Sequence, residues 1–222
     1  MSTPTATAVR LLAAVDLQGF PPASAWRTAP PIRFDADWQG RNSDPLRETE
    51  VRLLWTPETL HIRFQARYRS ITVFPDSDPD GRRDLLWDRD VAEAFLQPDP
   101  SALRSYKEFE VSPNGFWIDL NISCGKKRDL QSGLIHLVRI DEKSKQWIAE
   151  LSLPMKSLVV RFDPGTIWRA NFYRVEGQAE PRFYSAWCPT GTPQPNFHVP
   201  EAFGKLIFLE SLTPGRNRND QS

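Results

Sequence analysis

Alternation of apolar and polar residues recurs along the chain, and this pattern limits its fold more than any other feature. In residues 60–68, Leu60, Ile62 and Phe64 alternate with His61 and Arg63. A period of two is typical of a β-strand with one buried face. Other β-compatible runs are residues 91–97, 107–111, 116–121, 134–140, 147–153, 167–175 and 206–209. About ten short strands in succession predict an all-β, antiparallel β-sandwich of the jelly-roll kind.

Turn and breaker residues fit this prediction. The segment Ser112-Pro-Asn-Gly115 lies between two of the runs, and Asn-Gly supplies the positive φ of a hairpin turn. Asp163-Pro-Gly165 is a second turn. The best helical segment is short, residues 154–158, and the 20 prolines exclude a helical bundle. We therefore expect one domain over residues 1–222, with little helix and with frayed ends at 1–8 and 214–222.

Charge and hydropathy exclude several classes of protein. The 28 basic and 28 acidic residues cancel, so no charge excess drives binding to nucleic acid or to an anionic membrane. No run approaches the roughly 20 apolar residues of a membrane helix. Residues 9–17 make a poor signal peptide because they contain Arg10 and Asp16 and lack a basic start. The location is therefore left open: cytoplasmic as the sequence stands, secreted or periplasmic if translation starts upstream.

Metal and disulfide chemistry is only weakly indicated. The sequence leaves two alternatives for Cys124 and Cys188, a disulfide or two buried thiols. The lack of a CxxC motif argues against a zinc site. The sequence predicts no required cofactor. A calcium site is the exception left open, since Asp76, Asp78 and Asp80 begin like a calcium loop. Trp87 stands where an EF-hand needs its last glutamate, so we reject an EF-hand. Two alternatives stay open for this segment, a looser Ca²⁺ site and a solvated loop.

Two features combine aromatic and polar side chains. Glu93 lies in the middle of a predicted strand, on the face of Val91 and Phe95, where a carboxylate is costly unless it is paired. We expect either an exposed or ion-paired glutamate, or a carboxylate in a concave face that accepts sugar hydroxyls. Residues 187–204 form a long proline-rich loop with aromatic and amide side chains, which is either a structural lid or a binding loop.

Catalytic motifs are scarce. The chain has no GxSxG, no HExxH and no P-loop sequence. A pair of carboxylates for glycoside hydrolysis can be drawn from a group of five acidic residues. These are Asp88, Asp90, Glu93, Glu108 and Glu110. A glycoside hydrolase acting on O-glycosyl bonds therefore stays an alternative hypothesis.

Several segments together resemble a known family. They are Leu53–Leu60 (LLWTPETL), Leu86–Leu96 (LWDRDVAEAFL), Tyr106–Gly115 (YKEFEVSPNG), Trp147–Lys156 (WIAELSLPMK), Trp168–Glu176 (WRANFYRVE) and Phe203-Gly204. In this order they resemble the family 9 carbohydrate-binding modules, in particular stand-alone bacterial relatives. The resemblance covers residues 30–209 and implies a DOMON-like β-sandwich that holds a sugar between two aromatic rings.

The resemblance also implies particular site residues. Trp87 matches one stacking aromatic, Phe197 the second, and Glu93 the carboxylate that binds hydroxyls. The further polar positions fall on Glu110, Ser112 and Tyr173, with Gln194 or Asn196 beside the second ring. The family's sugar-binding modules have Trp at the second ring, Arg and Asn at the positions of Glu110 and Ser112, and Gln at that of Tyr173.

The predicted function is non-catalytic binding of a mono-, oligo- or polysaccharide, associated with carbohydrate catabolism. The departures from the family pattern also favour a second hypothesis, a sandwich interaction domain that has lost sugar binding. We expect Trp55, Trp147, Trp168 and Phe172 to fill the core, because they lie on strand patterns. The functional prediction then depends on Trp87, Phe197 and Glu93.

Overall fold

A computed structural model describes residues 3–75 and 81–211 of the 222-residue chain. Its strands are β1 (Thr5–Arg10), β2 (Ile32–Phe34), β3 (Thr49–Trp55), β4 (Thr59–Arg67), β5 (Val91–Gln97), β6 (Ser105–Val111), β7 (Trp117–Ser123), β8 (Lys126–Asp129), β9 (Ile135–Asp141), β10 (Gln146–Pro154), β11 (Trp168–Glu176), β12 (Phe183–Ala186) and β13 (Gly204–Leu209). The helical turns are η1 (Ala25–Thr28), η2 (Pro45–Arg47), η3 (Leu86–Asp88), α1 (Met155–Leu158) and η4 (Pro200–Ala202). The predicted all-β class is confirmed.

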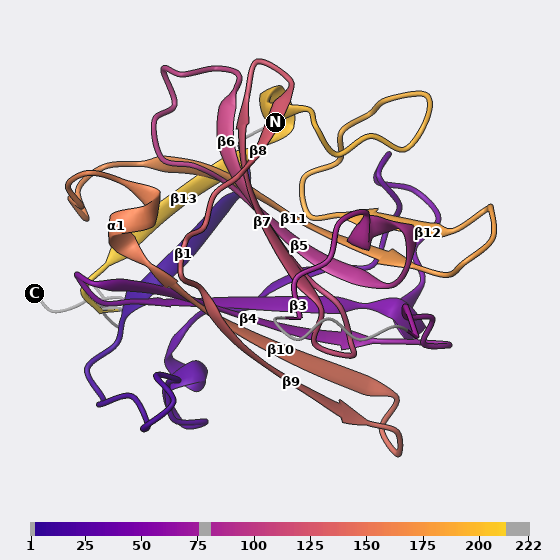
Figure 1. Cartoon of the computed structure of the whole chain (residues 1–222), viewed down its shortest axis with the longest axis horizontal. Helices are drawn as coiled ribbons and strands as arrows, with labels where there is room; N and C mark the ends of the chain where they lie inside the picture. Colours follow the sequence, from indigo (N-terminus) through magenta and orange to yellow (C-terminus); the bar gives the residue numbers. More distant parts are fainter. Residues whose placement is uncertain (1–2, 76–80, 212–222) are drawn as a thin grey trace, which may run out of the picture.

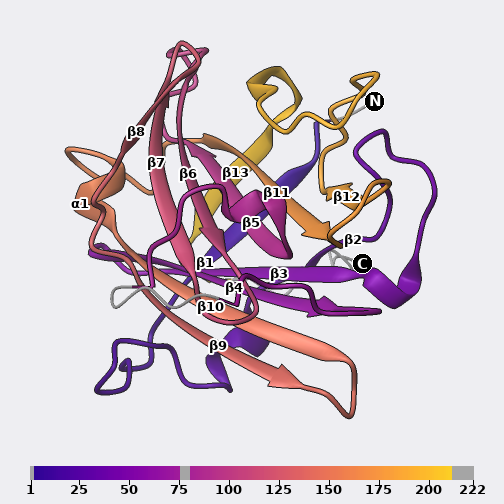
Figure 2. The ribbon, with the colours of Figure 1, turned by 45° about the vertical axis from the view of Figure 1, so that its right-hand side comes forward.

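The strands form one curled sheet that folds over itself into two layers (Figures 1 and 2). The first layer has the order β8-β7-β6-β5-β11-β13, and the second has β1-β3-β4-β10-β9. β1 joins the layers, because it pairs with β13 along Thr5–Val9 and with β3 along Ala8–Arg10. Both of these pairings are parallel, so the sheet is mixed rather than wholly antiparallel as predicted.

The core lies between the two layers. Alternate residues of β11, including Trp168 and Phe172, face inward and pack against side chains of the second layer. The rings of Phe172 and Phe64 meet edge to face with centroids 6.2 Å apart. Trp55 and Trp147 are also buried there. The four aromatic residues expected in the core are all found in it, and such rings contribute much of a core's stability.

The N-terminal segment differs from its prediction. Residues 1–8 were expected to fray, yet β1 begins at Thr5 and has strand neighbours on both sides. Ala6 and Ala8 are fully buried. Small residues give little hydrophobic signal, but they fit where two layers converge, which explains the wrong prediction. The expected frayed tail at 214–222 lies outside the described residues.

Several local predictions can be compared with the structure. The hairpin turn at 112–115 is confirmed between β6 and β7, with Gly115 at φ 89. α1 confirms the short helix expected at 154–158. Both cysteines are free; Cys188 is buried, but Cys124 is exposed. Asp76, Asp78 and Asp80, the weak calcium candidates, lie outside the described residues. Among the described residues, no helix is long and apolar enough to cross a membrane.

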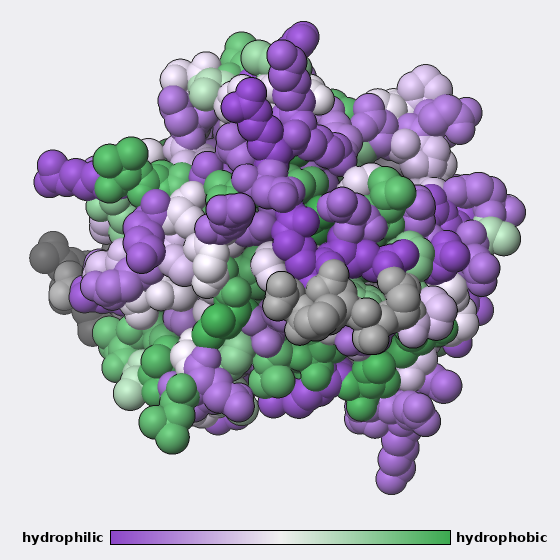
Figure 3. Space-filling view, in the orientation of Figure 1, coloured by the Kyte–Doolittle hydropathy of each residue, from purple (hydrophilic) through white to green (hydrophobic). Residues whose placement is uncertain are grey.

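The outward face of the first layer positions the candidate site. Odd-numbered residues of β5 and β11 and even-numbered residues of β6 and β7 point to this face, away from the core. The loop that follows β12, together with η3, covers part of it and buries Phe95, Tyr106 and Tyr173. Nearby, the upper middle of the view in Figure 3 is hydrophilic, which agrees with the exposed Lys126–Asp129 strand.

A buried histidine in β4 gives a pH-dependent contribution to stability. Burial lowers the pKa of His61 to about 4, and its Nδ1 lies 2.8 Å from Ser152 Oγ. In the unfolded chain this histidine takes up a proton near pH 6.5, whereas in the folded chain it stays neutral until the pH approaches 4. The contribution of His61 to the free energy of unfolding is therefore fully present above about pH 6.5 and decreases by about 3 kcal/mol as the pH falls toward 4. Urea unfolding across this range should show a steeper fall for the wild type than for His61→Gln, and parallel curves would contradict the assignment.

Candidate functional site

A pocket of about 220 Å³ opens on the outward face of the first layer. Strands β5, β6, β8 and β11 form its floor and one side with Glu93, Phe95, Glu108, Glu110, Lys127 and Val175. η3, β12 and the following loop supply the rest of the lining, which is Trp87, Tyr184, Pro195, Asn196, Phe197 and His198. The pocket thus combines several aromatic rings with three carboxylates.

The loop after β12 is held over the pocket by Tyr173. Its ring stacks on Phe197 with centroids 4.2 Å apart and planes 14° from parallel. The Tyr173 hydroxyl donates to the Phe197 carbonyl at 3.0 Å and accepts from Asn171 Nδ2 at 2.8 Å. Phe197 also meets the edge of Tyr184 at 6.1 Å. The second aromatic ring is therefore fixed on one face and at one edge, which prepares it for a ligand.

Trp87 belongs to the short turn η3, which precedes β5. Leu85, before the turn, has a positive φ of 57, and the Arg182 guanidinium donates to the Trp87 carbonyl at 2.7 Å. The ammonium of Lys127 lies 4.2 Å from the centroid of the Trp87 ring. Lys127 of β8 thus covers part of this half-buried ring.

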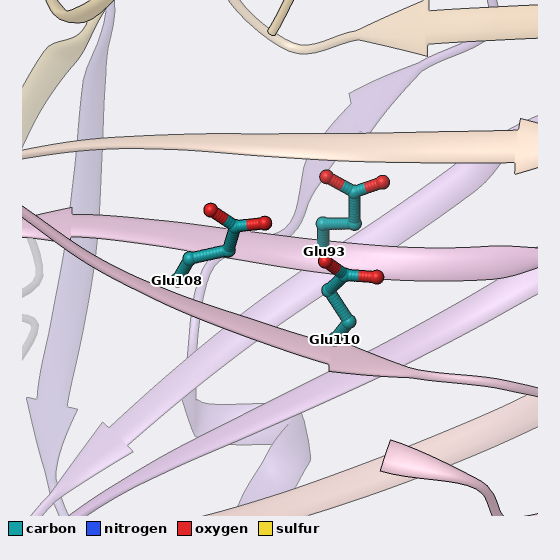
Figure 4. Close-up of side chains that lie close together, drawn as sticks. All are labelled: Glu93, Glu108 and Glu110. Carbon is teal, nitrogen blue, oxygen red and sulfur yellow. The ribbon is translucent and has the colours of Figure 1, made fainter. Parts of the chain in front are cut away.

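Glu93, Glu108 and Glu110 lie side by side on the pocket floor (Figure 4). Glu93 of β5 pairs directly with Glu110 of β6, and Glu108 lies two residues earlier on β6. Each offers one carboxylate oxygen, and these oxygens all lie within 4.8 Å of one another. Alternation places Glu108 and Glu110 on the outward face, where water would be expected. The covering loop leaves them only 1% exposed, and Glu93 3%.

Burial dominates the electrostatics of the cluster. It raises the pKa of both Glu93 and Glu110 well above the ordinary glutamate value. Neighbouring carboxylates raise both pKa values further, and Lys127 opposes the shift. Desolvation also lowers the pKa of His198, which favours the neutral imidazole. The His198 ring is held by Tyr106, whose hydroxyl lies 2.6 Å from Nδ1.

The structure brings together most of the residues that the sequence selected. Trp87, Glu93, Phe197, Glu110 and Asn196 all line the pocket. The remaining three do not. Tyr173 lies beneath Phe197, Ser112 is buried in the β6–β7 turn and donates to Asn114 Oδ1 at 2.9 Å, and Gln194 is exposed on the loop.

Sequence reasoning missed part of the pocket. Glu108 was considered only as one of five carboxylates for catalysis, although the alternation of residues 107–111 places it on the same face as Glu110. Lys127, Tyr184 and His198 were not selected. Their contacts depend on β8, β12 and the loop path, for which the sequence carries little periodic signal.

Comparison with known proteins assigns the fold to a family. The model of the family described as "Carbohydrate-binding family 9" matches residues 38–208. The chain belongs to this family. The match covers the pocket and confirms the family predicted from the ordered motifs, and with it the carbohydrate-binding class of function.

Two relatives match most of the chain. An extracellular protein of Arthroderma benhamiae is 26% identical over 222 residues, covering 92% of this chain and 96% of that protein. The UPF0462 protein C4orf33 homolog of Rattus norvegicus is 25% identical over 175 residues, covering 75% and 84% of the two chains. Neither name states a ligand.

Solved structures share the fold. A proposed carbohydrate-binding protein from Bacteroides uniformis superposes with a TM-score of 0.72 at 16% identity, covering 93% of this chain and all of that one. A family 9 module from Caldicellulosiruptor kristjanssonii, solved with cellotriose, gives 0.65 at 14% identity, covering 99% of this chain and 100% of that one. The same module was also solved with glucose.

Proposed function

We propose that this chain binds carbohydrate, without catalysis, in the pocket formed around Trp87, Glu93 and Phe197. The observation that carries the proposal is the convergence of these three side chains on one open pocket, from η3, β5 and the loop after β12. Family 9 is a family of binding modules, and its relatives solved with cellotriose and glucose support the same class of ligand.

The chemistry of the lining suits a sugar. A pyranose has apolar C–H faces that stack on aromatic rings and an equator of hydroxyls that need hydrogen-bond partners. Phe197 presents a ring that stacks on Tyr173, and Trp87 adds a second ring to the lining of the pocket. Glu93 and Asn196 offer oxygens to the hydroxyls. Both rings are half-buried and line the pocket instead of filling the core, which favours a ligand site over an interaction domain.

Calorimetric titration with glucose, cello-oligosaccharides and xylo-oligosaccharides tests the proposal. We expect a saturable heat with at least one of them, and no release of reducing sugar on long incubation. An absence of binding across these sugars and a wider glycan array would overturn the proposal, and steady release of reducing sugar would replace it with glycoside hydrolysis.

Phe197→Ala should weaken the binding of the best sugar about tenfold, because one stacking face is lost. Gln194→Ala is the matched control, since Gln194 lies on the same loop but outside the pocket. Its affinity should equal that of the wild type. Equal affinities for all three proteins would show that the sugar binds elsewhere.

A further inference from the structure

When they are ionised, the carboxylates of the pocket carry more negative charge than their surroundings neutralise. Among the described residues, Lys127 is the cation in contact with the cluster, with its ammonium 3.7 Å from Glu108 Oε1. Arg182 lies nearby but pairs with Glu180 at 3.0 Å. His198 Nδ1 is 3.8 Å from Glu108 Oε2 and is already in contact with Tyr106. Burial favours the protonated forms of Glu93 and Glu110, but a metal ion binds the ionised forms, and three ionised glutamates with one lysine leave two negative charges.

The oxygens of the cluster also lack hydrogen-bond donors. Neither oxygen of Glu110 has a hydrogen-bond partner in the described part of the chain, although this side chain is 1% exposed and lines the pocket. Glu93 Oε1 and Glu108 Oε2 are unpartnered as well. Buried carboxylates are normally paired or coordinate metals, because an isolated buried charge is expensive. Both oxygens of Glu110 are therefore available to coordinate an ion.

The ammonium of Lys127 already brings one positive charge to the edge of the cluster. Its ammonium lies between the Trp87 ring and Glu108, at 4.2 Å from the ring centroid. Its side chain is 36% exposed, so it reaches in from the edge of the pocket, where its ion pair is with Glu108.

We propose that Glu93, Glu108 and Glu110 bind one divalent cation of the Ca²⁺ type on the pocket floor. This cation offers its remaining coordination positions to oxygens of the pocket's ligand; that second part rests on the proposed function, whereas cation binding does not. Hard cations prefer oxygen ligands, and Ca²⁺ takes 6–8 of them at about 2.3–2.6 Å. Oxygens within 4.8 Å of one another can therefore share one such ion.

Charge and donor number favour this occupant. A divalent cation neutralises the two excess charges, whereas a single ammonium group neutralises only one. Three carboxylates fill part of a Ca²⁺ shell, and the open side of the pocket leaves room for water or for ligand hydroxyls.

Calorimetry of the chelator-treated full chain with calcium chloride alone tests the cation site. We expect one ion per chain, and Glu110→Gln should weaken its binding at least about tenfold because an anionic ligand is lost. Glu150→Gln is the matched control, a buried glutamate in the other layer that pairs with Arg139 at 2.7 Å. Its Ca²⁺ affinity should equal that of the wild type.

Lys127→Met keeps the test decisive if Glu110→Gln fails to fold. Removing the competing positive charge should tighten Ca²⁺ binding about tenfold or more. No calcium or magnesium binding by the wild type, equal affinity in Glu110→Gln, or unchanged affinity in Lys127→Met would each overturn the cation site. Glucosamine hydrochloride tests the alternative occupant, a ligand ammonium group. Binding of glucosamine with no binding of the metals would also overturn the cation site.

Sugar titrations in chelator and in calcium chloride test the second part. Tighter sugar binding with calcium supports it, and equal affinity in both overturns it while leaving the cation site intact. If calcium binds but no sugar does, the proposed function fails and the cation site stands.

Discussion

Arg174→Met is expected to lower the free energy of unfolding by about 3–5 kcal/mol, as measured by urea denaturation at neutral pH. Arg174 is fully buried at the inward face of β11, and its guanidinium lies 3.3 Å from Glu176 and 4.0 Å from Asp90. It also contacts the Val175 carbonyl and lies 5.1 Å from the centroid of the Trp147 ring.

The size of the effect comes from the carboxylates that would remain. Asp90 is 0% exposed and Glu176 3%, and burial already raises the pKa of both, against the opposing effect of Arg174. Without the guanidinium, both must stay charged in the core or take up a proton on folding. Methionine fills much of the lost volume, so the loss reports mainly on charge.

Arg33→Met is the control for this prediction. Arg33 pairs with Glu50 at 2.5 Å, but its side chain is 53% exposed, so removing it should cost under about 1 kcal/mol. The loss in Arg174→Met should also shrink at acidic pH, since the two carboxyls then carry protons in both states. A loss no larger than that of Arg33→Met would contradict the role assigned to Arg174.

The sequence was informative where one face of a strand is buried. Alternation located the strands that bear Glu93, Glu110 and Tyr173, and it assigned Val91, Glu93 and Phe95 to a common face. The ordered motifs then gave the family. Alternation follows from local physics, so a single sequence is enough to read it.

The remaining site residues depend on long-range placement. β8 consists of four exposed charged residues, so nothing local indicates that Lys127 lies over Trp87. The burial of Glu108 and Glu110 arises because a loop some 90 residues later in the chain covers them. β1 was missed because its buried residues include two alanines, whose small hydrophobic signal reveals little.

Trp87→Ala is expected to weaken the binding of the best sugar about 30-fold, which corresponds to about 2 kcal/mol. Trp87 has the largest ring in the lining, which also contains the three carboxylates. Its loss removes the stacking surface and frees the Lys127 ammonium to move toward the glutamates. Both changes disfavour a neutral ligand. Trp87→Phe should recover much of the affinity, because a smaller ring still stacks.

Trp117→Ala is the matched control for a lost tryptophan. Trp117 is also partly buried, but it packs against the core cluster on the opposite face of the first layer, with His136 at 6.1 Å. This variant should lose stability and keep its sugar affinity. A ligand-induced change in tryptophan fluorescence should persist in Trp117→Ala and largely disappear in Trp87→Ala. If Trp87→Ala binds sugar as tightly as the wild type does, this pocket is not the sugar site, and the sugar binds elsewhere on the sandwich.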